Sequence, residues 1–115
     1  MVKKPAYIPE KGDVVWLDFD PQAGHEQGGR RPAFVLSPAI YNSKTGLMLC
    51  CPITTQIKGY PFEVAVEDAG NAQGVILADQ VKSLDWQVRR AEKKGAVSKE
   101  ILKQVMGKIM AILEG

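Results

Sequence analysis

The 115-residue sequence is poor in the side chains that usually hold metals or form disulfides, with one histidine, His25, and two cysteines, Cys50 and Cys51. Together they cannot supply the four protein ligands of a standard structural zinc site. Because the cysteines are adjacent, their side chains point to opposite faces of any strand that contains both. We therefore expect two reduced thiols, as is typical of a cytoplasmic protein, and no metal or other cofactor.

Long apolar runs and a strong charge of either sign are also missing. No segment is apolar over the length of a bilayer, and Lys3 and Lys4 are followed at once by Pro5 rather than by a signal-peptide core. The formal net charge of +2 is too small to argue for a nucleic-acid partner, although its sign permits one. Neither GxGxxG nor a Walker A motif occurs. The length predicts one domain, residues 1–115, without a membrane segment.

Alternating apolar residues and turn signals predict several short strands. The predicted strands are 14–20, 33–37, 47–51, 62–66 and 75–84, with 86–91 as a continuation of the sheet after a bend. The apolar runs 33–37 and 47–51 indicate strands buried on both faces. Residues 21–31 are expected to form a loop, and residues 42–46 a turn.

One helix is predicted after the strands. Ser98 is placed to cap it, and an apolar face repeats at helical spacing over Ile101, Leu102, Val105, Ile109, Ile112 and Leu113. Short strands followed by one helix predict a mainly β fold, a small and strongly bent sheet or partly open barrel with a C-terminal helix.

Arg30 and Arg31 stand where the glycine-containing loop meets the strand predicted at 33–37. Alternation turns their side chains to opposite sides, so that one can face solvent while the other points into a groove. A guanidinium stays protonated and suits bidentate contact with phosphate. Taken alone, however, the pair favours ordinary surface arginines beside a strand.

Polar side chains also gather after the buried strand 47–51. Thr54, Thr55 and Gln56 are followed by Lys58 and Tyr60. Functional sites concentrate where strands leave a rigid scaffold, and these groups suit phosphate oxygens and sugar hydroxyls. A strand end followed by a Gly-Tyr-Pro turn explains the same residues equally well.

Asp79 shares the alternation of Val75, Leu77 and Val81 in the strand predicted at 75–84. A carboxylate on an otherwise apolar face needs hydrogen bonds or a charged partner, for which an arginine is the obvious candidate. A structural acid that holds a bend is the alternative, and the residues favour it slightly.

Five stretches together make the sequence resemble the MazF/PemK family of toxin endoribonucleases. They are GDVVWLDFDP (12–21), EQGGRRPAFVLSP (26–38), YNSKTG (41–46), PITTQIKGYPFEV (52–64) and GVILADQVKSLDW (74–86). They occur in the family's order and cover most of the chain between residues 12 and 97. The resemblance implies an SH3-like small barrel with a C-terminal helix, a homodimer, and metal-independent cleavage of single-stranded RNA. The cleavage it implies is attack by a ribose 2′-hydroxyl, leaving a 2′,3′-cyclic phosphate and a 5′-hydroxyl.

The resemblance also implies roles for particular residues. Arg31, directly before proline, matches the family's catalytic arginine, a phosphate clamp and general acid; since a guanidinium rarely gives up its proton, stabilisation of negative charge is the favoured role. Thr55 matches a second active-site residue that donates to the same phosphate. Glu26 matches an acid proposed as general base in some members. In others the acid stands at the position of Asp79, but the arginine that accompanies it there is replaced by Ala78.

Position and resemblance together indicate the residues that contact RNA. Phe19 and Tyr60 are expected to stack on unpaired bases. The residues expected to contact base edges or phosphates are Gln56, Lys58, Asp79, Gln80 and Lys82.

The family further implies an antitoxin partner, whose acidic disordered tail folds along the toxin and blocks the RNA groove. A binding module without chemistry remains the competing interpretation, because small barrels also bind nucleic acid or peptides without cleaving them. A purely structural subunit is a third interpretation, and it predicts no affinity for RNA.

Overall fold

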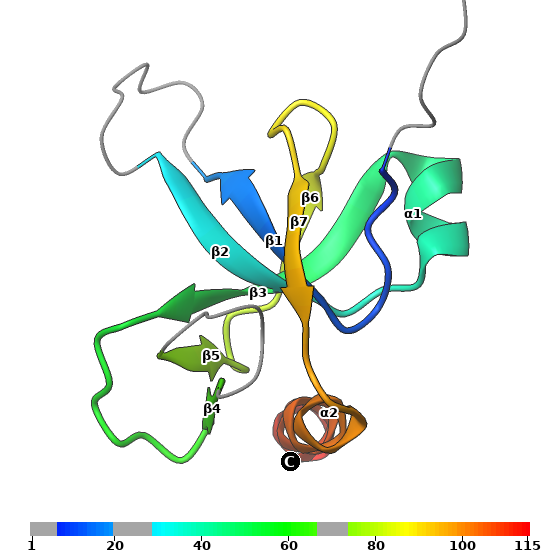
Figure 1. The fold of residues 1–115 in the computed structure, drawn as a ribbon. Coiled ribbons are helices and arrows are strands. Elements are labelled where there is room, and N and C mark those ends of the chain that lie inside the picture. The colour runs from blue at the N-terminus through cyan, green and yellow to red at the C-terminus, as the bar shows by residue number, and fades with distance from the viewer. Residues whose placement is uncertain (1–6, 20–28, 67–73) are drawn as a thin grey trace, which may run out of the picture.

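A computed structural model of the protein describes residues 7–19, 29–66 and 74–115. The predictions made for Glu26 and His25 lie outside the described residues. Within these ranges the chain forms seven strands and two helices (Figure 1). In chain order they are β1 (Asp13–Asp18), β2 (Arg30–Val35), α1 (Ala39–Thr45), β3 (Leu47–Thr54), β4 (Glu63–Ala65), β5 (Val75–Leu77), β6 (Lys82–Asp85), β7 (Glu92–Ala96) and α2 (Lys99–Glu114).

The seven strands form one antiparallel sheet in the order β4-β5-β3-β2-β1-β7, with β6 also paired to β3. β3 is the central strand because its first half pairs with β6 and its end pairs with β5. Figure 1 shows the consequence: β4 and β5 lie with α2 below the other strands, so the sheet is strongly bent. The predicted mainly β fold with a C-terminal helix is confirmed.

The bent sheet is buried on both sides, which gives two apolar clusters. Neighbouring residues of one strand belong to different clusters: Val14 lies in the cluster that includes α2, whereas Val15 lies in the cluster around Trp86. Cys51 and Cys50 divide in the same way and are free thiols. Burial raises the pKa of each to about 12. The expected opposite orientation of the two cysteines is confirmed.

α2 closes the first cluster from below. The Ser98 hydroxyl accepts a hydrogen bond from the backbone N–H of Ile101 at 3.3 Å, so the predicted cap is confirmed. Ile101 and Val105 are buried, but Ile112 and Leu113 at the end of the predicted apolar face are 51% and 73% exposed. In the part of the chain described, neither helix has the length and apolar character to cross a bilayer.

The turn predicted at 42–46 is wrong, because most of it belongs to α1. A fully buried Asn42 explains the helix: its Nδ2 donates to the carbonyl of Pro9 at 2.8 Å and to that of Ser37 at 3.0 Å. The Ser37 hydroxyl donates to Asn42 Oδ1 at 2.6 Å. These partners are distant or precede the helix, so they override the weak helical propensity of the segment. The helix ends at Gly46, whose φ is 75°.

The single long strand predicted at 75–84 is also wrong. Ile53 pairs with Ile76, and Cys50 pairs with Lys82. These pairs are three residues apart along β3 but six residues apart along the segment that contains β5 and β6. The three extra residues leave the sheet as a turn between β5 and β6, which the hydrogen bond from the Gln80 N–H to the Leu77 carbonyl closes at 3.0 Å. Residues 86–91 likewise form turns rather than sheet, and pairing resumes only at β7.

Candidate functional site

Arg30 and Arg31 point to opposite sides of β2, as predicted. Arg31 is exposed and lines a surface pocket of about 380 Å³ with Pro32, Ile53, Thr54, Thr55 and Gln56. The other side of the strand carries Arg30, which contacts neighbouring strands instead. The pocket therefore receives one of the two guanidinium groups, the one directly before proline.

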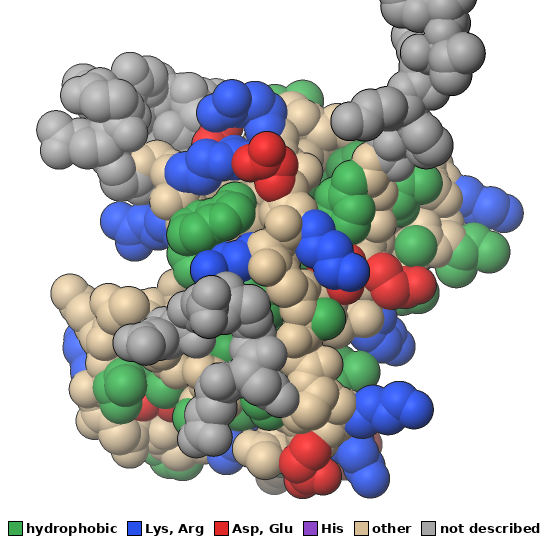
Figure 2. Space-filling view, viewed as in Figure 1, with side chains coloured by type: hydrophobic (Ala, Val, Ile, Leu, Met, Phe, Trp, Pro, Cys, Tyr) green, Lys and Arg blue, Asp and Glu red, His purple; other side chains and the backbone are tan. Residues whose placement is uncertain are grey.

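The pocket forms where β2 and β3 stop pairing. The last paired residues there are Ala33 on β2 and Pro52 on β3. Two residues beyond this pair, β2 carries Arg31 and β3 carries Thr54. Thr55 follows the end of β3 immediately and is exposed. The structure thus brings Arg31 into one pocket with Thr55 and Gln56, although more than twenty positions separate it from them in the sequence. In Figure 2 a hollow at the left edge separates the surface over β2 from that over the end of β3.

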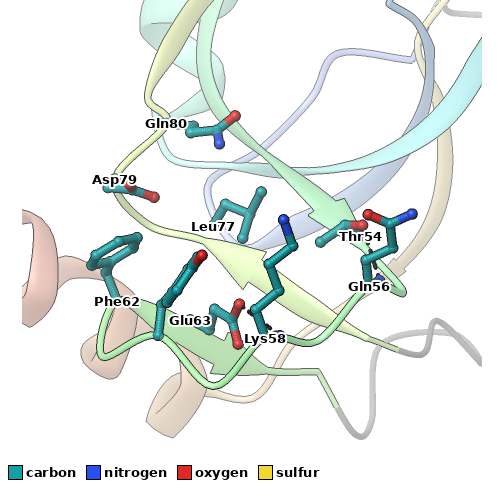
Figure 3. A pocket seen from close by; sticks show the side chains of 9 residues that line it. Thr54, Gln56, Lys58, Phe62, Glu63, Leu77, Asp79 and Gln80 are labelled. Atoms are coloured by element: carbon teal, nitrogen blue, oxygen red, sulfur yellow. Dashed lines mark hydrogen bonds between the residues drawn. The ribbon is translucent and has the colours of Figure 1, made fainter.

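A second pocket, of about 220 Å³, adjoins the first. It is lined by Thr54, Gln56, Lys58, Tyr60, Phe62, Glu63, Leu77, Asp79 and Gln80 (Figure 3). Thr54 and Gln56 line both pockets, so the two lie side by side, and together they are called here the groove. In Figure 3 the Lys58 side chain extends across β5 between Leu77 and Thr54, so its ammonium group lies over the middle of this pocket.

One side of the groove is the segment 55–62, which leaves β3 and returns at β4. The Glu63 carboxylate holds it by accepting hydrogen bonds from the backbone N–H groups of Lys58, at 3.1 Å, and Gly59, at 3.0 Å. Lys108 on α2 donates to the Pro61 carbonyl at 2.5 Å. Tyr60 is 50% exposed, and its ring lies 5.7 Å from that of Phe62. An aromatic face is therefore open beside the second pocket.

Asp79 and Gln80 reach the groove because of the turn between β5 and β6. The prediction that Asp79 lies on an apolar strand face is wrong, since β5 ends at Leu77 and Asp79 is exposed. The segment between β5 and β6 is three residues longer than pairing with β3 requires, and it places these two side chains at the edge of the second pocket.

The groove does not contain every residue predicted to contact RNA. Phe19 is partly buried against the cluster around Trp86, and Lys82 is exposed at the start of β6. Neither lines the groove as the described residues form it, and Glu26 lies outside these residues. Within the described ranges, no group of three or more His, Cys, Asp and Glu side chains is arranged to hold a metal ion.

Sequence reasoning missed an ion-pair network around Arg30. Its guanidinium donates to Asp18 at 2.9 Å, to Glu92 at 2.7 Å and to the backbone carbonyl of Arg90 at 2.6 Å. The Arg90 Nε donates to the second Asp18 oxygen at 2.8 Å. The hydrogen bonds from Arg90 and Arg30 hold the pKa of the Asp18 carboxyl below its ordinary value. We call Asp18, Arg30, Arg90 and Glu92 the Arg30 network; its members come from three distant stretches, so no local pattern could indicate it.

A third, more apolar pocket of about 180 Å³ continues from the groove. Its lining residues are Ala78, Asp79, Val81, Ile109, Ile112 and Leu113, of which Asp79 also lines the second pocket. It exposes the end of α2 and Val81, which is 43% exposed. Such a patch of exposed aliphatic side chains is typical of a protein–protein contact.

Comparison with known sequences identifies similar proteins over nearly the whole chain. The sequence model of a family described as PemK-like, MazF-like toxin of type II toxin-antitoxin system matches residues 10–113. The endoribonuclease toxin MazF of Escherichia coli K12 is 54% identical over 107 residues, which cover 93% of this chain and 96% of that protein.

Solved structures give the same result in three dimensions. MazF from Deinococcus radiodurans superposes with a TM-score of 0.85 and 54% sequence identity, covering 96% of this chain and 100% of that one. A second structure, of MazE-MazF from the same organism, matches with a TM-score of 0.84 and 48% identity over 94% of this chain and 97% of that one. The order of strands and the C-terminal helix described above are therefore shared with toxins of known structure.

Proposed function

The chain belongs to the PemK/MazF family of toxins from type II toxin–antitoxin systems, and from this premise we propose that it cleaves single-stranded RNA in the groove, with Arg31 and Thr55 at the scissile phosphate. The observation that carries this proposal is the pocket shared by these two side chains. Both are exposed there, Arg31 near the start of β2 and Thr55 directly after the end of β3.

The proposed reaction needs no nucleophile from the protein. The ribose 2′-oxygen attacks the adjacent phosphorus, the bond from phosphorus to the 5′-oxygen breaks, and a 2′,3′-cyclic phosphate and a 5′-hydroxyl result. One proton leaves the 2′-oxygen and one is added to the departing 5′-oxygen. Negative charge builds up on the non-bridging oxygens in between, so donors fixed near these oxygens lower the barrier.

Arg31 and Thr55 supply such donors. A guanidinium remains charged and offers a rigid set of N–H groups to phosphate oxygens, and a threonine hydroxyl adds one further donor. We assign proton removal from the 2′-hydroxyl to Glu26, following the family resemblance. Replacement of Glu26 by Gln keeps the size of the side chain and removes its basicity, so it tests this role.

The second pocket is proposed to receive the neighbouring nucleotides. Tyr60 presents an exposed ring on which a base can stack. Gln56, Lys58, Asp79 and Gln80 offer donors and acceptors around the same space. Phe19 and Lys82 are proposed to contact the RNA beyond the groove. Such contacts suit unpaired nucleotides, whose bases can stack on an aromatic side chain and present their Watson–Crick edges.

The decisive experiment incubates the purified protein with a mixed single-stranded RNA in excess EDTA and maps the new ends, with Arg31→Ala in parallel. We expect discrete cuts that carry 5′-hydroxyl ends, and a loss of at least about 100-fold in the variant, as is found when a charge-stabilising donor is removed. RNA binding without any cut in either protein would instead support the non-catalytic RNA-binding module.

A cognate antitoxin and a second copy of the chain are the proposed protein partners, in the cytoplasm. The relative from D. radiodurans has been solved as a MazE-MazF structure. An acidic antitoxin tail suits the groove, where Arg31 and Lys58 place positive charge. For the homodimer we propose the third pocket, because it exposes aliphatic side chains next to the groove.

The dimer proposal is tested by the mass of the protein in solution. Leu113→Glu places a charge in the third pocket and is expected to give monomers by light scattering. Ile40→Glu, on α1 and similarly exposed, is the matched control and should stay dimeric. Equal masses for Leu113→Glu and the unmodified protein would exclude this face as the dimer contact.

A further inference from the structure

The Arg30 network lies where β1 ends and β2 begins, next to Arg31, the proposed catalytic arginine. Asp18 and Arg30 are the outermost paired residues of the two strands, and the next inner pair is Leu17 with Arg31. Figure 2 shows basic and acidic side chains gathered over this end of the sheet, beside the turns at 86–91. The network therefore acts on the residues next to Arg31 in the sequence and in the sheet.

The network joins three separate parts of the chain. Arg30 connects β2 to Asp18 on β1 and to Glu92 on β7, and it also binds the Arg90 carbonyl in the turn before β7. The Arg90 guanidinium also donates to Asp18, so that each Asp18 carboxylate oxygen accepts from a different guanidinium. In the pair of Arg30 with Asp18 both side chains are partly buried, 28% and 16% exposed, so solvent screens this pair less than a fully exposed ion pair.

Further hydrogen bonds to backbone carbonyls hold the end of β1. Arg89 donates to the carbonyls of Asp18, at 3.0 Å, and Phe19, at 2.6 Å. The Phe19 N–H in turn donates to the Gly29 carbonyl at 2.8 Å, which ties the end of β1 to the start of β2. The turn 86–91 thus holds the backbone at Asp18 and Phe19, and Phe19 in turn binds Gly29, the residue before Arg30.

The turn itself is strained in order to make these contacts. Arg90 has a φ of 56° and is the one non-glycine residue among those described with a positive φ. A left-handed conformation costs an L-residue with a β-carbon about 1–2 kcal/mol. Such strain persists where surrounding contacts outweigh it, and here the Arg90 carbonyl and Nε both bind the network.

We propose that the Arg30 network is a positioning device for catalysis: by fixing Arg30 on the outer side of β2, it holds Arg31 turned into the groove. Neighbouring side chains of a strand point to opposite sides, so rotation of β2 that moved Arg31 would have to break the contacts of Arg30. Arg30 and Asp18 do not touch RNA in this proposal. It rests on the proposed function, because it assumes that Arg31 binds the scissile phosphate.

The test compares Arg30→Ala and Arg30→Lys with the unmodified protein. Single-turnover cleavage of a short RNA gives the rate, and the same RNA with a 2′-deoxy sugar at the cleaved position gives the Kd without reaction. For Arg30→Ala we expect the rate to fall on the order of tenfold, since small misplacements of a catalytic group are costly, while the Kd changes less than about threefold. Arg30→Lys keeps the charge but cannot reach three acceptors at once, so it should restore the rate only partly.

Lys93→Met is the matched control. It removes a different ion pair that also joins β7 to β1, the 3.8 Å contact between Lys93 and Asp13. This variant should cleave at the unmodified rate. If Arg30→Lys is fully active, only the charge of Arg30 matters and the positioning role is wrong. If the Kd for Arg30→Ala rises as much as its rate falls, Arg30 binds RNA directly and the role is equally wrong.

A readout without RNA separates this proposal from the proposed function. Hydrogen exchange of the Phe19 amide reports on the closure of β1 against β2, and Arg30→Ala should accelerate it at least about tenfold relative to Lys93→Met. Unchanged exchange would overturn the network's structural effect even if Arg31 proves essential. Faster exchange in a protein that cleaves no RNA would confirm the network while contradicting the proposed function.

Discussion

The two sides of the groove are held by different means. On the side of Arg31, the backbone is fixed by ion pairs and arginine-to-carbonyl hydrogen bonds among β1, β2, β7 and the turn 86–91. On the side of the segment 55–62, one carboxylate, Glu63, binds two backbone N–H groups, and Lys108 binds one carbonyl. The first side is tightly determined, whereas the second carries mostly exposed side chains.

This difference suits the two tasks proposed for the groove. Stabilising a transition state requires a donor held in one position, because reorganisation during the reaction costs rate. Thr55, the second proposed donor, follows the end of β3 directly and belongs with this first task. Contacting bases is the task of the exposed polar and aromatic groups after Thr55, whose exact placement is less critical, since every base offers a face for stacking. The comparison predicts that changes on the two sides have different consequences, and four substitutions test it.

The largest effect is expected from Gly74→Ala, because Gly74 lies against the backbone of Thr54 and Thr55, where the segment 55–62 begins. Gly74 has a φ of 119°, and a β-carbon there would lie 2.1 Å from the Thr54 carbonyl oxygen. The end of β3 must therefore move, and we expect a loss of at least about 3 kcal/mol in the free energy of unfolding by urea. Gly12→Ala is the control: its φ is 93°, but its β-carbon would meet nothing within 4 Å. Equal losses for both would mean that backbone conformation alone matters.

Thr55→Val should have the next largest effect. Valine keeps the branched shape and removes the hydroxyl that we place at the phosphate, so the single-turnover rate should fall by about 100-fold with little change in stability. Thr45→Val removes a hydroxyl that binds the Tyr41 carbonyl in α1 and should leave the rate unchanged. A fully active Thr55→Val protein would remove Thr55 from the catalytic group.

Tyr60→Ala tests the second side of the groove and should weaken binding rather than chemistry. Loss of one stacked base costs about 1–3 kcal/mol, so the Kd of the uncleavable RNA should rise about tenfold while the rate at saturation stays close to normal. Tyr60→Phe should restore the affinity, and Tyr41→Ala, on α1, serves as control. A fall in rate without a change in Kd would assign Tyr60 to the chemistry instead.

The smallest effect concerns the pH dependence of the Arg30 network. The pKa of Asp18 is lowered in the folded protein, by the hydrogen bond from Arg90 first and that from Arg30 second. Its contribution to stability is therefore present above the ordinary carboxyl pKa and is lost as the pH falls through the lowered value. Asp18→Asn should be less stable than the unmodified protein at pH 7, and the difference should vanish at acidic pH.

Asp79→Asn makes the same chemical change on the opposite side of the groove, outside the Arg30 network. Urea unfolding from pH 7 to pH 2 measures both variants. A constant difference between Asp18→Asn and the unmodified protein across this range would show that the charge of Asp18 does not stabilise the fold.

Local patterns were sufficient for much of the fold. Apolar residues on both faces predicted that 33–37 is buried on both sides, and Ala33 and Phe34 do face different apolar clusters. The same prediction for 47–51 is wrong at Leu47 and Leu49, which are each 37% exposed, although Met48, Cys50 and Cys51 are buried. Serine at position 98 followed by a helical apolar repeat predicted α2, because capping and amphipathic spacing act within a few residues. The order of motifs led to the family, and Arg31 and Thr55 were named from that resemblance rather than from their chemistry.

Only the tertiary structure decided how these parts combine. The unequal pairing of β3 with β5 and β6 brings Asp79 and Gln80 to the groove, and a local pattern cannot reveal it because β5 and β6 together read as one long strand. The buried Asn42 makes a helix of an expected turn through a contact with Pro9. Arg30 and Arg31 look alike in the sequence, but contacts from residues about sixty positions away give them different surroundings. Periodicity records which faces are buried, whereas the contacts that build the site depend on which distant strands meet.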